Sequence, residues 1–353
     1  MALLKIGRAG SLSTVSRLPT LNGVVLQGAL LLTLALAVPV VQAEEPNVWC
    51  PYESSDGSLP TPRHEAGGLA IGKDFYLLGG RQMRPVERLN TKTKKWANLG
   101  TTPMEMHHFQ PIEWGGKIYV IGAFTCCYPD EPSISHIQIF DPVTKTWSIG
   151  DEIPASRLRG STGAVVYNDK IYILGGNTLG HNGGAVNWFD EYDPATGEWT
   201  VMPNAPHARD HFVAVLVGDK LVAAAGRQSA LPVPQANTES GVDVFDFKSG
   251  KWLNGYQDIP TPRAGGGAVN YKREVLVLGG ETVDKDAEAA VEALNVDTKT
   301  WRSLPSMSIG RHGQGAAVID DHLYVAAGST VRGGSGETDS VEWLDLRDPG
   351  ADD

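Results

Sequence analysis

The sequence predicts an all-β fold in which six similar four-stranded units close into a ring. Three observations support this: the composition, a six-fold internal repeat and a tryptophan displaced to the N-terminal end. The 353 residues include 41 glycines and 22 prolines, which suits a fold with many tight turns. Together these residues remain below the ~25–30% that is typical of low-complexity disorder. Hydrophobic residues make up 41% of the chain, enough to form a core.

Residues 1–43 are predicted to be a signal peptide and are set aside from the fold. Three basic residues precede an apolar run at 24–41, and Val41-Gln42-Ala43 supplies the small residues that a signal peptidase reads. The mature chain, residues 44–353, is then one domain that is secreted or periplasmic. An uncleaved anchor is the alternative, because the run is close to the ~20 residues of a spanning helix. After cleavage, no stable membrane span is expected.

The charge balance argues against nucleic acid as a partner. The chain carries 30 basic and 41 acidic residues, a formal net charge of −11. The predicted signal peptide holds basic residues and no acidic ones, so the mature chain is more acidic still. Nucleic-acid binding and generic binding to anionic membranes require the opposite sign.

A short apolar strand that ends in small residues occurs six times along the chain. The copies are residues 75–80, 118–123, 171–176, 221–226, 275–280 and 323–328. An anchor residue precedes each copy at one constant offset and marks the start of each unit. The anchors are Arg63, Met106, Arg159, Arg209, Arg263 and Arg311. An offset without gaps in all six units indicates a true structural repeat.

A second pattern follows each of these strands. Another strand ends in Asn or Asp, and in the first five units a tryptophan stands six residues further on. These tryptophans are Trp96, Trp147, Trp199, Trp252 and Trp301. Turn residues such as Asp193-Pro194-Ala195-Thr196-Gly197 lie between the two strands. Each unit is therefore predicted to hold four antiparallel strands: one after the anchor, one ending in small residues, one ending in Asn/Asp, and one containing tryptophan.

The sixth unit lacks its tryptophan, whereas an unassigned Trp49 stands at the other end of the chain. We expect an N-terminal strand at about residues 47–50 to complete the sixth sheet. Such an exchange closes the ring and removes exposed sheet edges.

Together, the Gly-Gly after an apolar strand, the aromatic–Asp pair, the later tryptophan and the following Pro-Arg resemble the kelch repeat. The resemblance covers nearly all of residues 47–346 and implies a six-bladed β-propeller. The chain distantly resembles exported bacterial N-acetylneuraminate mutarotases, through Glu281-Thr282 after Gly279-Gly280, and the kelch domain of galactose oxidase, and no catalytic role is carried over from the former. That oxidase depends on copper, but its pattern of tyrosine, histidine and cysteine ligands is not recognisable here, so copper is not assigned.

Antiparallel order brings the start of each first strand and the end of each second strand to one face. By the resemblance, the first strand also lines the central channel. Titratable residues gather at these positions. The candidate catalytic bases are His108, His211, Glu65, His64 and His107. The candidate substrate-binding residues are Arg63, Arg81, Arg159, Arg209, Asp210, Arg227, Glu281, Arg311 and His312.

Each group also has a structural interpretation. Anchor arginines of kelch repeats, here including Arg263, commonly hydrogen-bond neighbouring blades. A histidine on a partly buried strand often bonds a backbone carbonyl. Side chains alternate across a strand, so His64, His107 and His312 should point one way and His108 and His211 the other. We expect at most one of these two groups to face the channel.

Three functions fit this ring of residues. The guanidinium groups of arginines bind carboxylates through two hydrogen bonds, and a His or Glu can act as general base. The leading prediction is therefore that the protein binds an acidic saccharide or other small anionic ligand. It could also transform this ligand by lyase or epimerase chemistry. The alternative is a noncatalytic module that binds a protein or glycan. The third is a metal-dependent oxidoreductase or hydrolase that holds a divalent metal at the histidine cluster.

The three cysteines, Cys50, Cys126 and Cys127, are all expected on the ligand face. An odd number in an exported protein allows one disulfide and one free thiol. Cys50 could pair with Cys126 or Cys127 across the channel mouth, or the two adjacent cysteines could pair with each other.

Overall fold

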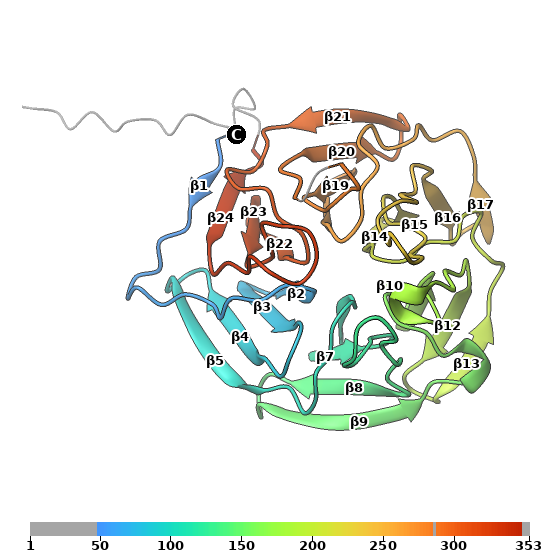
Figure 1. Ribbon diagram of the computed structural model, residues 1–353, viewed down its shortest axis with the longest axis horizontal. Helices are drawn as coiled ribbons and strands as arrows, with labels where there is room; N and C mark the ends of the chain where they lie inside the picture. Colours follow the sequence, from blue (N-terminus) through green and yellow to red (C-terminus); the bar gives the residue numbers. More distant parts are fainter. Residues whose placement is uncertain (1–47, 285–286, 348–353) are drawn as a thin grey trace, which may run out of the picture. The chain divides into compact units, whose positions relative to one another are not determined.

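A computed structural model describes residues 48–284 and 287–347. These residues form six four-stranded antiparallel sheets arranged in a ring, which confirms the predicted six-bladed propeller (Figure 1). Within the described ranges the helices are two short 3-10 turns, η1 (Ala155–Arg157) and η2 (Gly180–Asn182), and no helix there is long and apolar enough to cross a membrane. The predicted signal peptide lies outside the described residues.

The first three blades follow one another along the chain. Blade 1 contains β2 (Ala66–Ile71), β3 (Asp74–Gly79), β4 (Pro85–Asn90) and β5 (Lys95–Thr101). Blade 2 contains β6 (Pro111–Trp114), β7 (Lys117–Val120), β8 (His136–Asp141) and β9 (Thr146–Glu152). Blade 3 contains β10 (Gly163–Tyr167), β11 (Lys170–Leu174), β12 (Phe189–Asp193) and β13 (Glu198–Val201).

The last three blades continue in the same order, and the final one borrows a strand. Blade 4 contains β14 (Ala214–Val217), β15 (Lys220–Ala223), β16 (Asp243–Asp246) and β17 (Lys251–Leu253). Blade 5 contains β18 (Gly267–Tyr271), β19 (Glu274–Leu278), β20 (Val291–Asn295) and β21 (Thr300–Leu304). Blade 6 contains β22 (Gly315–Ile319), β23 (His322–Ala326), β24 (Val341–Asp345) and β1 (Cys50–Pro51).

The second strand of each blade is the most apolar because it is covered on both faces. In β11, Ile171, Tyr172, Ile173 and Leu174 are all buried. A short continuous apolar run is the pattern of a strand enclosed in this way. The hydrophobic clusters lie between neighbouring blades, so burial of these strands also joins each blade to the next.

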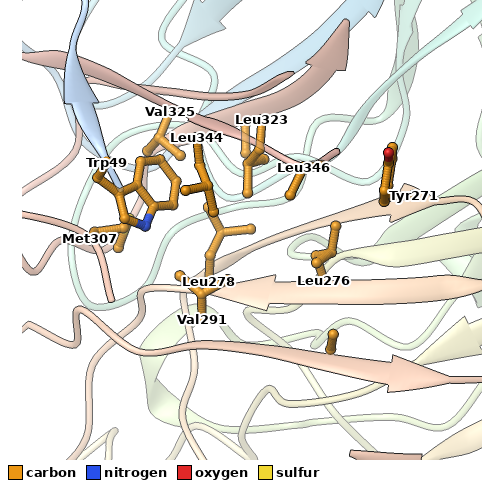
Figure 2. Close-up of a cluster of buried hydrophobic side chains, with 12 residues drawn as sticks. Trp49, Tyr271, Leu276, Leu278, Val291, Met307, Leu323, Val325, Leu344 and Leu346 are labelled. Carbon is orange, nitrogen blue, oxygen red and sulfur yellow. The ribbon is translucent and has the colours of Figure 1, made fainter. Parts of the chain in front are cut away.

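The ring closes through the N-terminal strand, as the sequence predicts. β1 pairs antiparallel with β24, with Cys50 opposite Trp343 and Pro51 opposite Glu342. Trp49 is buried between blades 5 and 6, among side chains that include Leu278 and Leu344 (Figure 2). Its indole Nε1 donates a hydrogen bond of 2.8 Å to the carbonyl oxygen of Pro305.

We expect Trp49→Phe to lower the free energy of unfolding by about 1–2 kcal/mol. The smaller ring leaves part of its site unfilled, and the partly buried carbonyl of Pro305 loses its donor. Urea unfolding monitored by circular dichroism measures the change. The control is Trp343→Phe in the same sheet, whose partly buried indole packs beside His322 and should lose less than about 1 kcal/mol. Equal stability of Trp49→Phe and the parent would contradict a docked closing strand.

Six inner strands surround the axis of the ring. β2, β6, β10, β14, β18 and β22 contact one another in cyclic order, and each is the inner edge of its sheet. The backbone groups on that edge have no further strand to pair with in their sheet, so they border the central space. The starts of these strands share a face with the loops between second and third strands, where the candidate site residues lie.

Candidate functional site

The second residue after each anchor adopts a left-handed backbone. These six residues, named here the axial ring, are Glu65, His108, Ser161, His211, Gly265 and Gly313, with φ between 53° and 69°. Glycine accepts this conformation freely, whereas it costs other residues roughly 1–2 kcal/mol each. Four of the six are not glycine, so the surrounding structure must hold their backbones in this unfavourable conformation.

Hydrogen bonds join the axial ring from blade to blade. The amide of His108 donates to the carbonyl of Glu65 at 3.2 Å, and Ser161 donates to His108 at 2.9 Å. Gly265 donates to His211 at 2.7 Å, Gly313 to Gly265 at 2.6 Å, and Ala66 to Gly313 at 3.1 Å. Between blades 3 and 4, the amide of His211 donates instead to the hydroxyl of Ser161 at 2.8 Å. The left-handed turn thus aims backbone groups along the circumference and fixes the ring residues in place.

A central cavity of about 390 Å³ lies against the axial ring. Its walls are the six inner strands, with small and aliphatic side chains such as Ala164 and Val318. Glu65, His108, Ser161 and His211 meet it at the starts of those strands. Among the described residues that line it, Glu65 and Glu113 are the charged ones, so the cavity offers no positive group to an anion.

Glu65 is the acidic group that the axial ring contributes to the cavity. Its Oε2 lies 3.2 Å from His108 Nε2, and its Oε1 lies 3.6 Å from His312 Nδ1. Burial raises the pKa of Glu65, but His108 and His312 oppose this and hold the pKa well below its usual value. For His312, the same carboxylate and Glu281 outweigh burial, which alone would lower the pKa, so the pKa is raised. The cavity wall therefore carries an ionised carboxylate held between imidazoles.

Three buried histidines gather beside this carboxylate. The rings of His108 and His211 are 4.5 Å apart between centroids, and His181 lies 5.3 Å and 5.1 Å from them. Burial, the largest cause, together with Arg227 and His108 lowers the pKa of His211 to about 3. Burial also lowers the pKa of His108. These two imidazoles are therefore neutral at neutral pH and able to act as ligands or proton acceptors.

Carboxylates orient two of the three rings. His211 Nδ1 lies 2.5 Å from Asp210 Oδ1, and His181 Nδ1 lies 2.5 Å from Glu131 Oε2. His108 Nδ1 faces His107 Nδ1 at 2.5 Å, and burial lowers the pKa of His107 to about 2. These contacts occupy Nδ1 of each ring and leave Nε2 as the nitrogen that could bind a ligand.

The arginines next to the cluster are already paired. Arg81 forms an ion pair with Glu131, and Arg227 bonds Glu281 at 2.5 Å. Although burial raises them, the pKa values of Glu131 and Glu281 are lowered overall by neighbouring histidines and these arginines. Neither guanidinium lines the cavity.

The anchor arginines lie deeper, each within its own blade. All five side chains are fully buried, and each donates to a carbonyl at the end of the second strand and forms an ion pair with a carboxylate on the third strand. The pairs are Arg63–Glu87, Arg159–Asp190, Arg209–Asp243, Arg263–Glu292 and Arg311–Glu342. None of the five lines the cavity, and their side-chain contacts are structural but stay within one blade instead of bonding the neighbouring blade as expected.

The histidines divide into two groups along the lines that side-chain alternation predicts. His108 and His211 line the cavity. His64, His107 and His312 lie away from it, and His64 Nδ1 instead contacts Glu337 Oε1 at 2.7 Å. The structure therefore brings together Glu65, His108, His211, Asp210, Arg81, Arg227, Glu281 and His312, and it leaves the anchor arginines outside.

The sequence did not identify the carboxylates that pair with the anchor arginines, nor His181 and Glu131. The carboxylates that pair with the anchor arginines all stand three residues before the Asn/Asp of the third strand, a spacing that could have revealed them. Blade 2 follows the same rule, because Gln138 replaces the carboxylate where Met106 replaces the arginine. His181 and Glu131 lie in irregular loops between second and third strands, where no repeat position signals them.

The cysteines form one pair, and it is the adjacent one. Cys126 and Cys127 are joined by a disulfide in the loop after β7, whereas Cys50 is a free thiol. Cys50 lies in β1 at the outer edge of blade 6, so the alternative bridge across the channel mouth is not formed. The ring of Tyr128, the next residue, lies 5.0 Å from that of His181, which places the disulfide loop next to the histidine cluster.

Comparisons with known proteins agree on the repeat. Residues 110–328 match the family model described as the KLHDC2/KLHL20/DRC7 Kelch-repeats domain. Kelch-like protein terF of Aspergillus terreus is 28% identical over 92% of this chain and 73% of its own length. Acyl-CoA-binding domain-containing protein 4 of Arabidopsis thaliana is 25% identical over 74% of this chain, which spans 41% of that protein.

A solved structure supports the architecture. The structure of YjhT superposes with a TM-score of 0.66, covering 80% of this chain and 95% of its own, at 19% sequence identity. At that identity the likeness establishes the fold alone.

Proposed function

Because this chain belongs to the kelch-repeat family, whose propellers serve as interaction modules for proteins or ligands, we propose that its central cavity binds a small uncharged carbohydrate or polyol. We also propose that Glu65 transfers a proton on that ligand. The observation that carries the proposal is the position of Glu65, which lies partly buried between two histidines and lines a cavity of about 390 Å³.

The wall of the cavity suits a ligand rich in hydroxyl groups. The inner edges of six strands present backbone donors and acceptors that the sheets leave unpaired. A polyol can bond these groups from several sides, while its ring faces pack against the small aliphatic side chains. Pockets that combine apolar lining with a few fixed polar groups are typical small-molecule sites.

Proton transfer at Glu65 is supported by its place on the cavity wall and by its ionised state, although the lowered pKa makes the carboxylate a weak base. An ionised carboxylate on a cavity wall can take a proton from a ligand hydroxyl or from an acidified C–H and return it. His108, 3.2 Å away, holds the carboxylate in position and can share the proton. This step is common to lyases and epimerases, the reaction classes predicted from the sequence.

The acidic saccharide predicted from the sequence receives less support than an uncharged one. Arg81 and Arg227 are paired with carboxylates, and the charged residues lining the cavity are Glu65 and Glu113. A carboxylated ligand would meet like charge in a site of low dielectric constant, which disfavours binding.

The test compares methyl glucoside with methyl glucuronide, which differ in one carboxylate. Saturation-transfer NMR should detect the glucoside, with the glucuronide bound at least 10-fold more weakly, and Glu65→Gln should narrow that difference. A time course by NMR should show turnover that falls by more than about 100-fold in Glu65→Gln. Glu113→Gln is the control for charge alone. Tighter binding of the glucuronide would restore the acidic-saccharide hypothesis, and binding of neither sugar would reject carbohydrate as the ligand.

One observation favours protein binding as a second function. Exposed apolar side chains recur in the loops between second and third strands, all on the face that carries the cluster: Met83, Tyr128, Leu179, Leu231, Val233 and Val283. Apolar residues gathered on one face are typical of a docking surface. A partner bound there should be retained by Glu65→Gln, which separates this function from the first.

We also propose that the mature protein acts outside the cytoplasm. The Cys126–Cys127 disulfide supports this location, because disulfides persist mainly in oxidising compartments.

A further inference from the structure

We propose that His108, His181 and His211 form a binding site for a divalent transition-metal ion beside the central cavity, which His108 and His211 line. The proposal goes beyond the proposed function, because it concerns an ion held by the chain's own side chains and needs no organic ligand. The three histidines come from blades 2, 3 and 4 and are all buried.

The spacing of the three rings suits one ion. A ring nitrogen of each histidine lies within 4.8 Å of the corresponding atoms of the other two. Zinc–nitrogen bonds of ~2.1 Å place two ligands of a tetrahedral site roughly 3.4 Å apart. Small rotations of the rings bring the nitrogens from the observed spacing to that distance.

The hydrogen bonds around the cluster select the nitrogen that would bind. Nδ1 of His211 contacts Asp210, Nδ1 of His181 contacts Glu131, and Nδ1 of His108 contacts His107, each at 2.5 Å. A metal-bound histidine usually presents its second nitrogen to a carboxylate in this way, which sets the tautomer and the ring orientation. Two carboxylate–histidine pairs on one cluster are therefore the outer contacts that a metal site requires.

The Nε2 atoms of the three histidines are the nitrogens left to bind a metal, and burial without a good partner is costly for them. Nε2 of His211 is buried and has no hydrogen-bond partner, and Nε2 of His108 is buried with Glu65 Oε2 at 3.2 Å as its polar neighbour. Leaving such an atom unpaired costs about 1–3 kcal/mol, so native structures rarely keep it without reason. Nε2 of His181 contacts Arg227 Nη2 at 3.1 Å, a contact that the ion would replace. Arg227 would keep its bonds to Glu281 and Ser229.

The charge around the cluster favours a cation. Among the described residues facing it, the carboxylates are Glu65, Glu131, Asp210 and Glu281, and the cations are Arg81 and Arg227. Two negative charges remain, and a protonated His312 beside Glu65 and Glu281 would still leave one. Imidazole ligands with surplus carboxylates nearby suit zinc, copper, nickel or cobalt better than magnesium or calcium, which prefer oxygen ligands.

A neighbouring set of residues offers a weaker alternative. His107, His108 and Glu131 also place ligand atoms within 4.8 Å of one another. In that set, however, Glu131 is already bonded to Arg81 and His181, and the two histidines face each other through Nδ1. Three histidines leave a fourth position of a tetrahedral ion for water or a ligand, as catalytic zinc sites do. Glu65 stands 3.2 Å from His108 Nε2 and can accept a hydrogen bond from such a water.

The test loads the EDTA-treated full chain with Co²⁺ and with Zn²⁺, without any sugar present. We expect one equivalent of metal per chain by elemental analysis after gel filtration. The Co²⁺ form should show the visible absorption of a four-coordinate ion with nitrogen ligands. His181→Ala should weaken metal binding by more than about 10-fold and remove this absorption, because it deletes one of the three ligands. His181 itself does not line the cavity.

Two further variants keep the test decisive. His181→Gln retains a polar side chain and should lose the metal while circular dichroism and urea unfolding report a folded protein. His207→Ala is the matched control, because His207 also pairs with a carboxylate, Asp243 at 2.7 Å, but lies outside the cluster. It should bind metal like the parent. Absence of stoichiometric binding, or equal binding by the parent and both His181 variants, would overturn the proposal. Sugar binding is measured separately, so either proposal can fail alone.

Discussion

Arg263→Met is expected to destabilise the propeller by about 3–5 kcal/mol. Arg263 is fully buried, bonds Glu292 at 2.5 Å and donates to the carbonyls of Gly279 and Val277. Removing one partner of a buried ion pair leaves the other charge without compensation. Burial lowers the pKa values of three other anchors, Arg63, Arg159 and Arg311, which shows how costly an isolated charge is at these positions. Urea unfolding measures the loss.

Blade 2 supplies the control for this experiment. It carries Met106 and Gln138 where the other blades carry an arginine and a carboxylate. The double variant Arg263→Met/Glu292→Gln should therefore recover to within about 1 kcal/mol of the parent, because an uncharged pair replaces the ion pair. A double variant as unstable as the single one would show that packing of the guanidinium, rather than charge, is what matters.

Gly313→Ala is expected to cost about 3–5 kcal/mol and to displace Glu65. At φ +61° a new Cβ would stand 2.3 Å from the backbone nitrogen of Glu65, so the backbone itself must move. Left-handed strain contributes roughly 1–2 kcal/mol and overpacking roughly 1–3 kcal/mol. Urea unfolding gives the stability, and glucoside binding reports the position of Glu65.

Gly265→Ala separates strain from collision. Gly265 holds the same place in the axial ring at φ +69°, but its nearest neighbour would be His312 Cβ at 3.8 Å. This variant should therefore lose only the strain, about 1–2 kcal/mol, and keep Glu65 in place. Equal losses in the two variants would contradict the close contact between blades 6 and 1.

The fold could be predicted because its determinants repeat. The constant offset from each anchor to the small residues, and the tryptophan missing from one end and present at the other, defined the blades and their closure. Side-chain alternation also separated His108 and His211 from the remaining histidines. Each of these signals depends on regular backbone geometry, which a sequence pattern records directly.

The site could be predicted only in part, because its residues depart from that regularity. Glu65 and His108 adopt a left-handed backbone conformation that is rare for their residue types. The residue types in the axial ring therefore did not reveal this conformation. His181 enters from a short 3-10 turn in a loop without a repeat equivalent. The pairing of Arg81 and Arg227 with carboxylates depends on contacts between blades. Because the sequence did not show these pairings, we expected a site with net positive charge, whereas the charged groups around the cluster have a net negative charge.

The joint between β1 and β24 also determines how the molecule can come apart. While it holds, every blade has two neighbours and the array has no terminal unit. Release of β1 would leave blades 6 and 1 joined only by packing, and loss of that packing would give a linear array with two free ends, from which units can detach one at a time, as in solenoid proteins. The two-residue pairing of β1 with β24 thus helps the six similar blades to unfold cooperatively.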